Sequence, residues 1–274
     1  MKRKLFLVIS LLFIFSSSYI AYTQFTPVEI GMRAEIEEFL KTAEIVNSVD
    51  IGEGVTNPKR LFLQNEDMGR MSGAWKNVEG KQKGAWEGWQ YEIAAYQMDK
   101  LLDLNMIPPT VEREFKGKKG SLQFWVSSPM SELDRTEQKK GIPKSRYDNW
   151  EKRRHIARAF DCLIANNDRT QQNIRYTADM RWILIDHSRS FYSARRDRKR
   201  LVYGKKGHKE KKLIKKLPRV FLEKIKALTY DTIKDAVGPY LKDNEIKAVM
   251  LRKELLLKEI EGMIKEMGED KFLY

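Results

Sequence analysis

The spacing of apolar residues changes near the middle of this chain, and the change restricts the folds open to it. In the first part, apolar residues alternate with polar ones in short runs between turn residues, as in Pro58–Gln64. This alternation predicts paired β-strands. In the second part, apolar residues recur every three or four positions, as in Asp148–Ile164, which predicts amphipathic helices. A β-rich part followed by a helical part is typical of an α+β arrangement of two lobes.

Individual elements follow from the same patterns and from their caps. The expected strands of the first part are Ile45–Val55, Pro58–Gln64, Gly73–Val78, Val111–Phe115 and Ser121–Val126. The expected helices of the chain are Met32–Ala43, Gln90–Leu104, Asp148–Ile164 and a last one with an N-cap at Asp243 and a stop at Gly268. A polar loop, Asn166–Asn173, precedes a short buried strand, Arg181–Ile185. We place the first lobe at residues 24–126 and the second at residues 127–274.

The N-terminus has the layout of an export signal. Three basic residues, at positions 2–4, precede an uninterrupted apolar run, Leu5–Phe15. If the segment is not cleaved, Leu5–Tyr22 is barely long enough to cross a bilayer, and the basic residues would hold its start in the cytoplasm. A buried N-terminal helix is the remaining alternative. We therefore expect residues 1–23 to be a signal peptide or anchor, with the domain outside the cytoplasm.

Three polar residues of the second lobe have a spacing suited to phosphoryl transfer. Asp168 and Asn173 lie in the polar loop, and Asp186 follows the short apolar strand. In such a site one aspartate takes the proton of the attacking hydroxyl, while the asparagine and the second aspartate hold Mg²⁺ against the nucleotide phosphates. Their carboxylate and amide oxygens suit a hard cation.

The first lobe contains two residues that would complete this site. Lys76 lies within a strand-like stretch beside Trp75, and Glu92 opens the next helix. A strand lysine paired with a helix glutamate holds the α- and β-phosphates in kinases. Considered singly, each residue has a simpler interpretation. Lys76 would be an exposed residue at the edge of a sheet, and Glu92 would be an acid in the first turn of a helix, where the helix dipole stabilises negative charge. Together with Asp168 and Asp186, the ion pair is the better interpretation.

Several of these segments resemble a known group of enzymes. The sequences around Tyr91–Tyr96, Ile107–Pro109, Phe160–Arg169 and Leu184–Ser188 resemble the atypical kinases related to the four-jointed and Golgi secretory-pathway kinases. They are also similar to HipA and to the phosphatidylinositol 3-/4-kinase-like group. The resemblance implies a two-lobed protein-kinase-like fold that transfers the γ-phosphate of ATP to a hydroxyl, with Mg²⁺ or Mn²⁺ as the metal.

The same resemblance assigns roles to individual residues. It implies that Asp168 is catalytic, that Asn173 and Asp186 bind the metal, and that Lys76 and Glu92 bind the nucleotide. The turn that covers the phosphates would contain Gly52 and Gly54. The adenine would lie against the end of the strand Leu122–Val126, where the backbone of Phe124, Trp125 and Val126 would form the hinge.

Positive charge is concentrated in one segment. Of the formal charge of +14, most lies in residues 195–216, which contain twelve lysines or arginines and two acidic residues. Such a patch fits an anionic substrate or surface, although a solvated loop is an equally simple interpretation. Tyr203 is its one aromatic residue, too few for the stacking that single-stranded nucleic acids need. We therefore expect no specific nucleic-acid binding.

Two functions are compatible with the sequence. The first is an ATP-dependent phosphotransferase that acts on an exported protein, a glycan or an anionic lipid headgroup. The second is a catalytically inactive kinase-like module, recruited to an anionic partner or membrane through residues 195–216. The single cysteine, Cys162, rules out an internal disulfide framework and a cysteine-rich zinc site, and its apolar neighbours predict a buried thiol.

Overall fold

The computed structural model describes residues 25–52, 57–82, 84–128, 130–205 and 213–274. The predicted leader, Gly54 and the middle of the basic segment lie outside the described residues. In the part of the chain that is described, no helix has both the length and the apolar character needed to cross a membrane.

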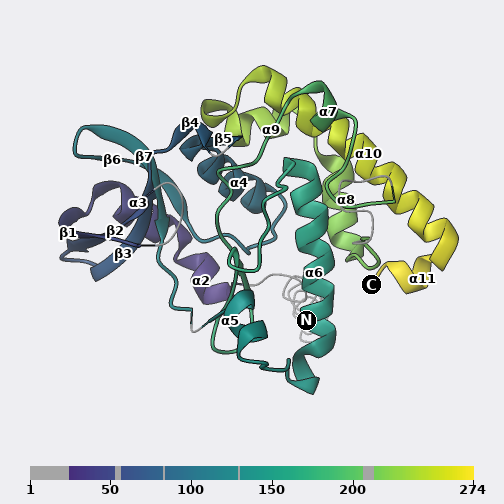
Figure 1. Cartoon of the computed structure of the whole chain (residues 1–274), viewed down its shortest axis with the longest axis horizontal. Coiled ribbons are helices and arrows are strands. Elements are labelled where there is room, and N and C mark those ends of the chain that lie inside the picture. Colours follow the sequence, from purple (N-terminus) through teal and green to yellow (C-terminus); the bar gives the residue numbers. More distant parts are fainter. Residues whose placement is uncertain (1–24, 53–56, 83, 129, 206–212) are drawn as a thin grey trace, which may run out of the picture.

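A five-stranded antiparallel sheet forms one side of the molecule (Figure 1). Its strands, in spatial order, are β1 Glu44–Asp50, β2 Lys59–Asn65, β3 Gly69–Lys76, β7 Lys118–Phe124 and β6 Thr110–Phe115. The helix α3 Arg33–Thr42 covers one face and buries Phe39 and Leu40 against Leu61, Leu63 and Trp75. The alternation of these apolar side chains predicts the strands, and all five expected strands of this lobe are present.

A second, two-stranded hairpin lies between the sheet and the next helix. It consists of β4 Glu79–Gln82 and β5 Ala85–Gly88, and it leads directly into α4 Trp89–Leu101. This hairpin is not among the expected strands, because Glu79–Gln82 is polar and lacks an apolar alternation. A turn signal was present at Gly84, whose φ of +86° is a conformation that favours glycine.

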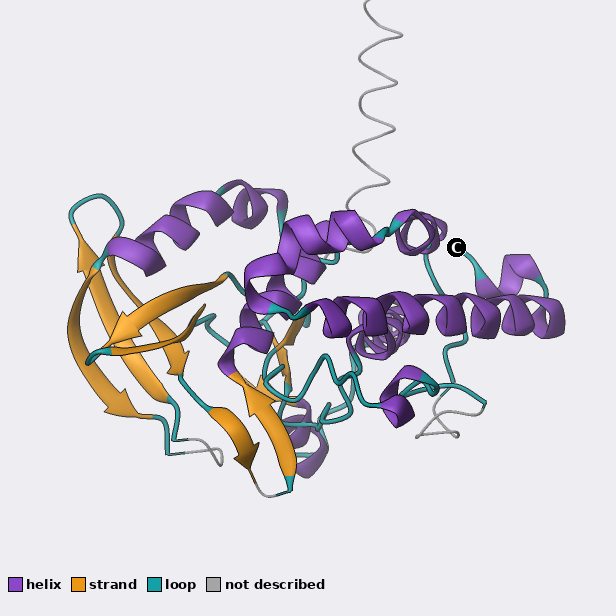
Figure 2. Ribbon diagram, turned by 90° about the horizontal axis from the view of Figure 1, so that it is seen from above, coloured by secondary structure: helices purple, strands orange, loops and turns teal. Residues whose placement is uncertain are grey.

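Helices form the other side of the molecule (Figure 2). The long ones are α6 Lys144–Ile164 and α10 Asp243–Met267, which pack against each other, with α8 Arg219–Ala227 and α9 Tyr230–Val237 beside them. The short helices are α2 Pro27–Gly31, α5 Glu132–Glu137, α7 Arg195–Arg198, η1 Gly238–Tyr240 and α11 Glu269–Phe272. A small sheet consists of β8 Met130–Ser131, which precedes α5, and of β9 Ile174–Tyr176 and β10 Trp182–Leu184, which follow the polar loop.

The ends of three helices differ from the expectation. Helix α6 begins at Lys144, four residues before the expected start at Asp148. Helix α4 ends at Leu101 rather than Leu104, because Asp103 and Asn105 adopt φ values of +51° and +53°, which a helix cannot contain. Asp243 is the first residue of α10 and not its N-cap. The N-cap is Lys242, whose backbone N–H donates to Glu245 at 2.7 Å. The predicted stop at Gly268 is confirmed.

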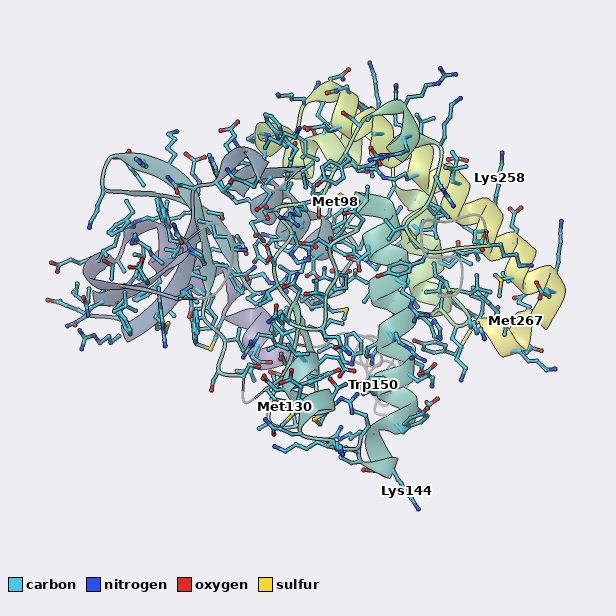
Figure 3. All side chains as sticks on the ribbon, in the orientation of Figure 1. Met98, Met130, Lys144, Trp150, Lys258 and Met267 are labelled. Atoms are coloured by element: carbon cyan, nitrogen blue, oxygen red, sulfur yellow. The ribbon has the colours of Figure 1, made fainter. Side chains whose placement is uncertain are left out.

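The core has two parts, and α4 belongs to the larger one. Tyr96 and Met98 of α4 are fully buried in a cluster with α6, α8, α9 and α10, whereas the smaller cluster joins α3 to the sheet. Figure 3 labels Met98 on α4 and, by contrast, the exposed Lys258 on the outer side of α10. Helix α4 is therefore anchored in the helical half, which fixes its position relative to the loop after α6.

Candidate functional site

Three of the predicted residues meet in one chain of ion pairs. Lys76 Nζ donates to Glu92 Oε1 at 2.7 Å and to Asp186 Oδ1 at 2.8 Å. Lys76 ends β3, Glu92 lies in the first turn of α4, and Asp186 follows β10. Glu92 is 2% exposed, whereas the Asp186 side chain is 37% exposed. Residues 110 positions apart thus come together at the boundary between the two halves.

The charges of Lys76 and Glu92 stabilise each other. Burial alone would raise the pKa of Glu92, but the charge of Lys76 and the hydrogen bond from His187 hold that pKa far below its usual range. Burial likewise opposes the charge of Lys76, yet Asp186 and Glu92 raise its pKa above the ordinary value. Both groups therefore stay ionised at neutral pH, and their geometry is fixed by mutual attraction.

His187 supports the glutamate from the other side. Its backbone N–H donates to Glu92 Oε2 at 2.9 Å, and its ring Nε2 lies 2.8 Å from Arg169 Nη2. Because arginine can only donate, Nε2 is the acceptor and the ring proton sits on Nδ1, 3.7 Å from Glu92 Oε2. Burial and the charge of Arg169 lower the pKa of His187, so the ring is neutral.

The polar loop presents Asp168 and Asn173 beside this centre. Asn173 Nδ2 donates to the backbone oxygen of Asp168 at 2.9 Å, which leaves the amide oxygen as the atom suited to a cation. Arg169 ties the loop down: its Nη1 donates to the backbone oxygens of Asn173 at 3.0 Å and Ile185 at 2.8 Å. Its Nη2 also pairs with the buried Asp161 at 3.0 Å. Arg169 thereby links the loop to the strand that precedes Asp186.

Glu87 and Arg189 belong to the same site, although neither is among the residues predicted from the sequence. Arg189 donates to Glu87 Oε1 at 2.9 and 2.6 Å, and its Nη1 lies 3.4 Å from Asp168 Oδ2. Ser188 Oγ lies within hydrogen-bond distance of Glu87 Oε2, at 3.1 Å, and of Asp186 Oδ1, at 3.3 Å. The signal available was an acid between two tryptophans in Trp86–Trp89, a stretch with no assigned element.

The oxygen atoms of this site fit a divalent cation. Asp186 and Asn173 supply a carboxylate and an amide oxygen, and Glu87 brings a second carboxylate that shares the Ser188 hydroxyl with Asp186. Hard cations such as Mg²⁺ and Mn²⁺ prefer such oxygen ligands. Over the described ranges, no group of three or more His, Cys, Asp or Glu side chains forms a metal cluster.

The three predicted hinge residues lie within the described part of the chain, whereas only Gly52 of the two phosphate-turn glycines does. Strand β7 ends at Phe124, whose backbone N–H donates to Pro109 O at 2.8 Å, and Trp125 N–H donates to Ser72 O at 2.9 Å. Those two N–H groups therefore have partners within the protein. Val126 follows without regular secondary structure. Gly52 has a φ of +73°, as expected of a glycine turn after β1.

The described part of the basic segment turns its arginines outward. In α7, Arg195, Arg196 and Arg198 are exposed, whereas Asp197 is 7% exposed and faces the buried Arg252. Arg252 is fixed in turn by hydrogen bonds to the backbone oxygens of Leu163 and Tyr192, both at 2.8 Å. The electrostatic attraction between Asp197 and Arg252 favours this orientation of the helix.

Cys162 is fully buried, as predicted. Burial raises the pKa of its thiol to about 12, so a reactive thiolate does not form at neutral pH. In α10, the side chains of Ile246, Val249, Leu256, Ile260 and Met263 are buried in the larger core cluster.

Comparison with known proteins identifies the fold. No family model and no curated protein sequence matches the chain. Among solved structures, a hydra Fam20 with sugar is similar with a TM-score of 0.64 and 14% identity, over 93% of this chain and 95% of that one. The Golgi casein kinase with Mn/ADP bound gives a TM-score of 0.61 and 14% identity, over 92% of this chain and 80% of that one.

A bacterial kinase is similar as well. The proinflammatory kinase CtkA of Helicobacter pylori has a TM-score of 0.54 and 13% identity, over 84% of this chain and 99% of that one. These similarities confirm the predicted α+β, kinase-like fold. One of the similar structures is of a Golgi kinase, and the sequence segments named above resemble the Golgi secretory-pathway kinases.

Proposed function

We propose that this chain is an atypical kinase that transfers the γ-phosphate of ATP to a hydroxyl group on an exported protein, a glycan or an anionic lipid headgroup. The observation that carries the proposal is the Lys76–Glu92–Asp186 chain of ion pairs, with Asp168 and Asn173 in the adjoining loop. The similar structures described as kinases support it.

Each residue has a role in this proposal. Lys76, held in place by Glu92, contacts the α- and β-phosphates, and Asp168 accepts the proton of the attacking hydroxyl. Asn173 and Asp186 hold Mg²⁺ or Mn²⁺, which when bound neutralises charge on the phosphates. Gly52 and Gly54 cover the phosphates, and Phe124, Trp125 and Val126 adjoin the base. The two lobes are residues 24–126 and 127–274.

We place the protein outside the cytoplasm, exported or anchored by residues 1–23. The charged and apolar pattern of that segment supports this placement, and one of the similar structures is of a Golgi protein.

Thermal unfolding with and without Mg²⁺-ATP tests the nucleotide site without knowledge of the acceptor. Ligand at a hundredfold over Kd stabilises a protein by about 2.7 kcal/mol. We expect a metal-dependent rise in Tm that Asp186→Asn abolishes and that Asp235→Asn, an exposed aspartate of α9, preserves. A Tm that does not respond to nucleotide with either metal would contradict the proposal.

Phosphate transfer is tested with γ-labelled ATP and three acceptors: an acidic protein, a glycan and anionic vesicles. Asp168→Ala should abolish label transfer to whichever acceptor the wild-type protein uses, while nucleotide binding continues. Full transfer by this variant would show that Asp168 is not the catalytic residue.

A second candidate function is favoured by the exposed arginines of α7. A catalytically inactive kinase-like module could be recruited by this surface to an anionic membrane. Binding to phosphatidylserine vesicles together with an absence of nucleotide binding would support this function. Phosphate transfer by the wild-type protein would reject it.

A further inference from the structure

Arg60 lies on the face of the sheet that carries Lys76. In the pairing of β2 with β3, Arg60 is opposite Ala74, and residues directly opposite each other share a face. Lys76 lies two positions beyond Ala74 and therefore points to the same side. The intervening residues Leu61 and Trp75 point to the opposite side and are buried against α3. Arg60 is thus on the side of the sheet where Lys76 meets Asp186.

The guanidinium of Arg60 is held against an aromatic ring at the end of β7. Its central carbon lies 4.3 Å from the centroid of the Trp125 ring and 5.0 Å from that of Phe62. Its Nε donates to Ser72 Oγ at 3.1 Å. Two fixed partners, one aromatic and one hydroxyl, define the position of this arginine.

A cavity of about 300 Å³ opens beside this pair. Its lining includes Arg60, Ser72, Phe124, Trp125 and Ser127. The volume is at the lower end of the range for small-molecule sites, and the lining combines aromatic rings with a few polar groups, as ligand sites do. A single planar ring system is the part of a nucleotide that fits such a space.

The backbone donors near this cavity are already engaged. The N–H groups of Phe124 and Trp125 donate to Pro109 O and Ser72 O. The strongest side-chain donor in the lining is the Arg60 guanidinium, which has no acceptor atom. A base bound here therefore meets a group that can only donate hydrogen bonds.

We propose that Arg60 and Trp125 determine which base the nucleotide site accepts, and that the site takes guanine as readily as adenine. Guanine offers two adjacent acceptors, N7 and O6, to a guanidinium, whereas adenine offers N7 beside an N6 donor. This inference rests on the proposed nucleotide site, and it states which bases that site accepts. It concerns binding, so it holds whether or not the acceptor is known.

The test is a comparison of dissociation constants for Mg²⁺-ATP and Mg²⁺-GTP, measured on the full chain by calorimetry with non-hydrolysable analogues. The wild-type protein should bind the two within about threefold of each other. Arg60→Met should weaken GTP binding by about tenfold or more, and ATP binding by less, because a bidentate arginine–guanine contact contributes about 1–3 kcal/mol of discrimination. Trp125→Ala should weaken both nucleotides alike.

Two variants separate this effect from misfolding. Arg60→Lys keeps a donor and should retain part of the GTP affinity, whereas Arg70→Met, at an exposed arginine of β3, should leave both constants unchanged. A wild-type preference for ATP over GTP greater than about tenfold, or unchanged constants in Arg60→Met, would overturn the inference while the nucleotide site stands. Failure of the wild-type protein to bind either nucleotide would instead reject the proposed function, and this inference with it.

Discussion

The centre around Asp186 and the helix α7 are both rich in charge, yet they hold it in opposite ways. Around Asp186, Lys76 and Glu92 compensate each other in a largely buried network, and Arg169 is paired with Asp161. On α7, Arg195, Arg196 and Arg198 face solvent, and the one acid of the helix, Asp197, points inward.

The buried charges have fixed positions, whereas the exposed charges remain available to bind a partner. Buried charges must be paired, so the positions of Lys76, Glu92 and Asp186 are fixed before any ligand arrives. Ion pairs between exposed arginines and neighbouring charges add little stability in water. The positive potential of these arginines can therefore attract an anionic partner. Substitutions in the first region should therefore change stability and nucleotide binding, and those in the second should change only association with anions.

Lys76→Met should have the largest effect, because it leaves the Glu92 carboxylate buried without its cation. Removing one partner of a buried pair destabilises a protein by about 3–5 kcal/mol. Urea unfolding at constant m-value measures the change, and nucleotide binding should be lost as well. Lys119→Met is the matched control, since Lys119 pairs with Glu112 on the surface, and it should have little effect. Equal denaturation midpoints for the two variants would refute the contrast between buried and exposed charge.

Arg169→Lys keeps the charge but loses the planar group that contacts the loop, Asp161 and His187 together. We expect a loss of about 2–3 kcal/mol, because buried acceptors are left without donors. Chemical denaturation gives the loss, and amide exchange in the loop shows whether it has loosened. Wild-type stability in this variant would mean that the loop is held by other contacts.

Asp99→Asn tests how a buried charge contributes to stability, because the effect of this substitution should depend on pH. Asp99 is fully buried on α4, its Oδ1 accepts from the N–H groups of Met106 and Ile107, and burial raises its pKa to about 7 from an ordinary 3.8. Because the folded-state pKa lies above the unfolded value, its contribution to stability is fully present below about pH 4 and is lost as pH rises through 7.

The variant has no carboxyl to titrate at this position. Its stability relative to the wild-type protein should therefore rise between pH 5 and pH 8, by about 2–3 kcal/mol at most. Thermal or urea unfolding at both pH values measures the difference. A difference independent of pH would show that Asp99 does not titrate in this range.

Charge reversal on α7 should have the smallest effect on folding. The triple variant Arg195→Glu, Arg196→Glu, Arg198→Glu should change the free energy of unfolding by less than about 1 kcal/mol, because Asp197 and Arg252 hold the helix from beneath. Binding to phosphatidylserine vesicles should be lost, and in the wild-type protein it should weaken as salt is added. Unchanged vesicle binding would remove this surface as a membrane contact.

The sequence is sufficient to predict most of this fold and the meeting of Lys76, Glu92 and Asp186. Strand alternation and helical spacing are local patterns, and the acidic and amide residues stand at spacings that the kinase reaction requires. The fold prediction is confirmed by the similar structures, whereas the roles of the site residues stay predictions.

Residues whose importance depends on distant partners could not be predicted. Arg189 is significant only because it meets Glu87, which lies 102 positions away on a hairpin with no apolar alternation. In the sequence, Arg60 is indistinguishable from any other arginine of a strand. Its contact with Trp125 depends on the pairing of strands that places the end of β7 beside it. Apart from the acid between Trp86 and Trp89, the sequence contains no local signal for these contacts.

Phe191 has a consequence for the motions of the protein. It is fully buried and packs against Tyr91, with ring centroids 5.8 Å apart, yet its φ is +58°, and Asp186 has a φ of +60°. A left-handed backbone conformation is unfavourable by about 1–2 kcal/mol for a non-glycine residue. Burial of the Phe191 ring offsets this cost. We therefore expect the segment that carries Asp186 to open at a lower free energy than the helices around it.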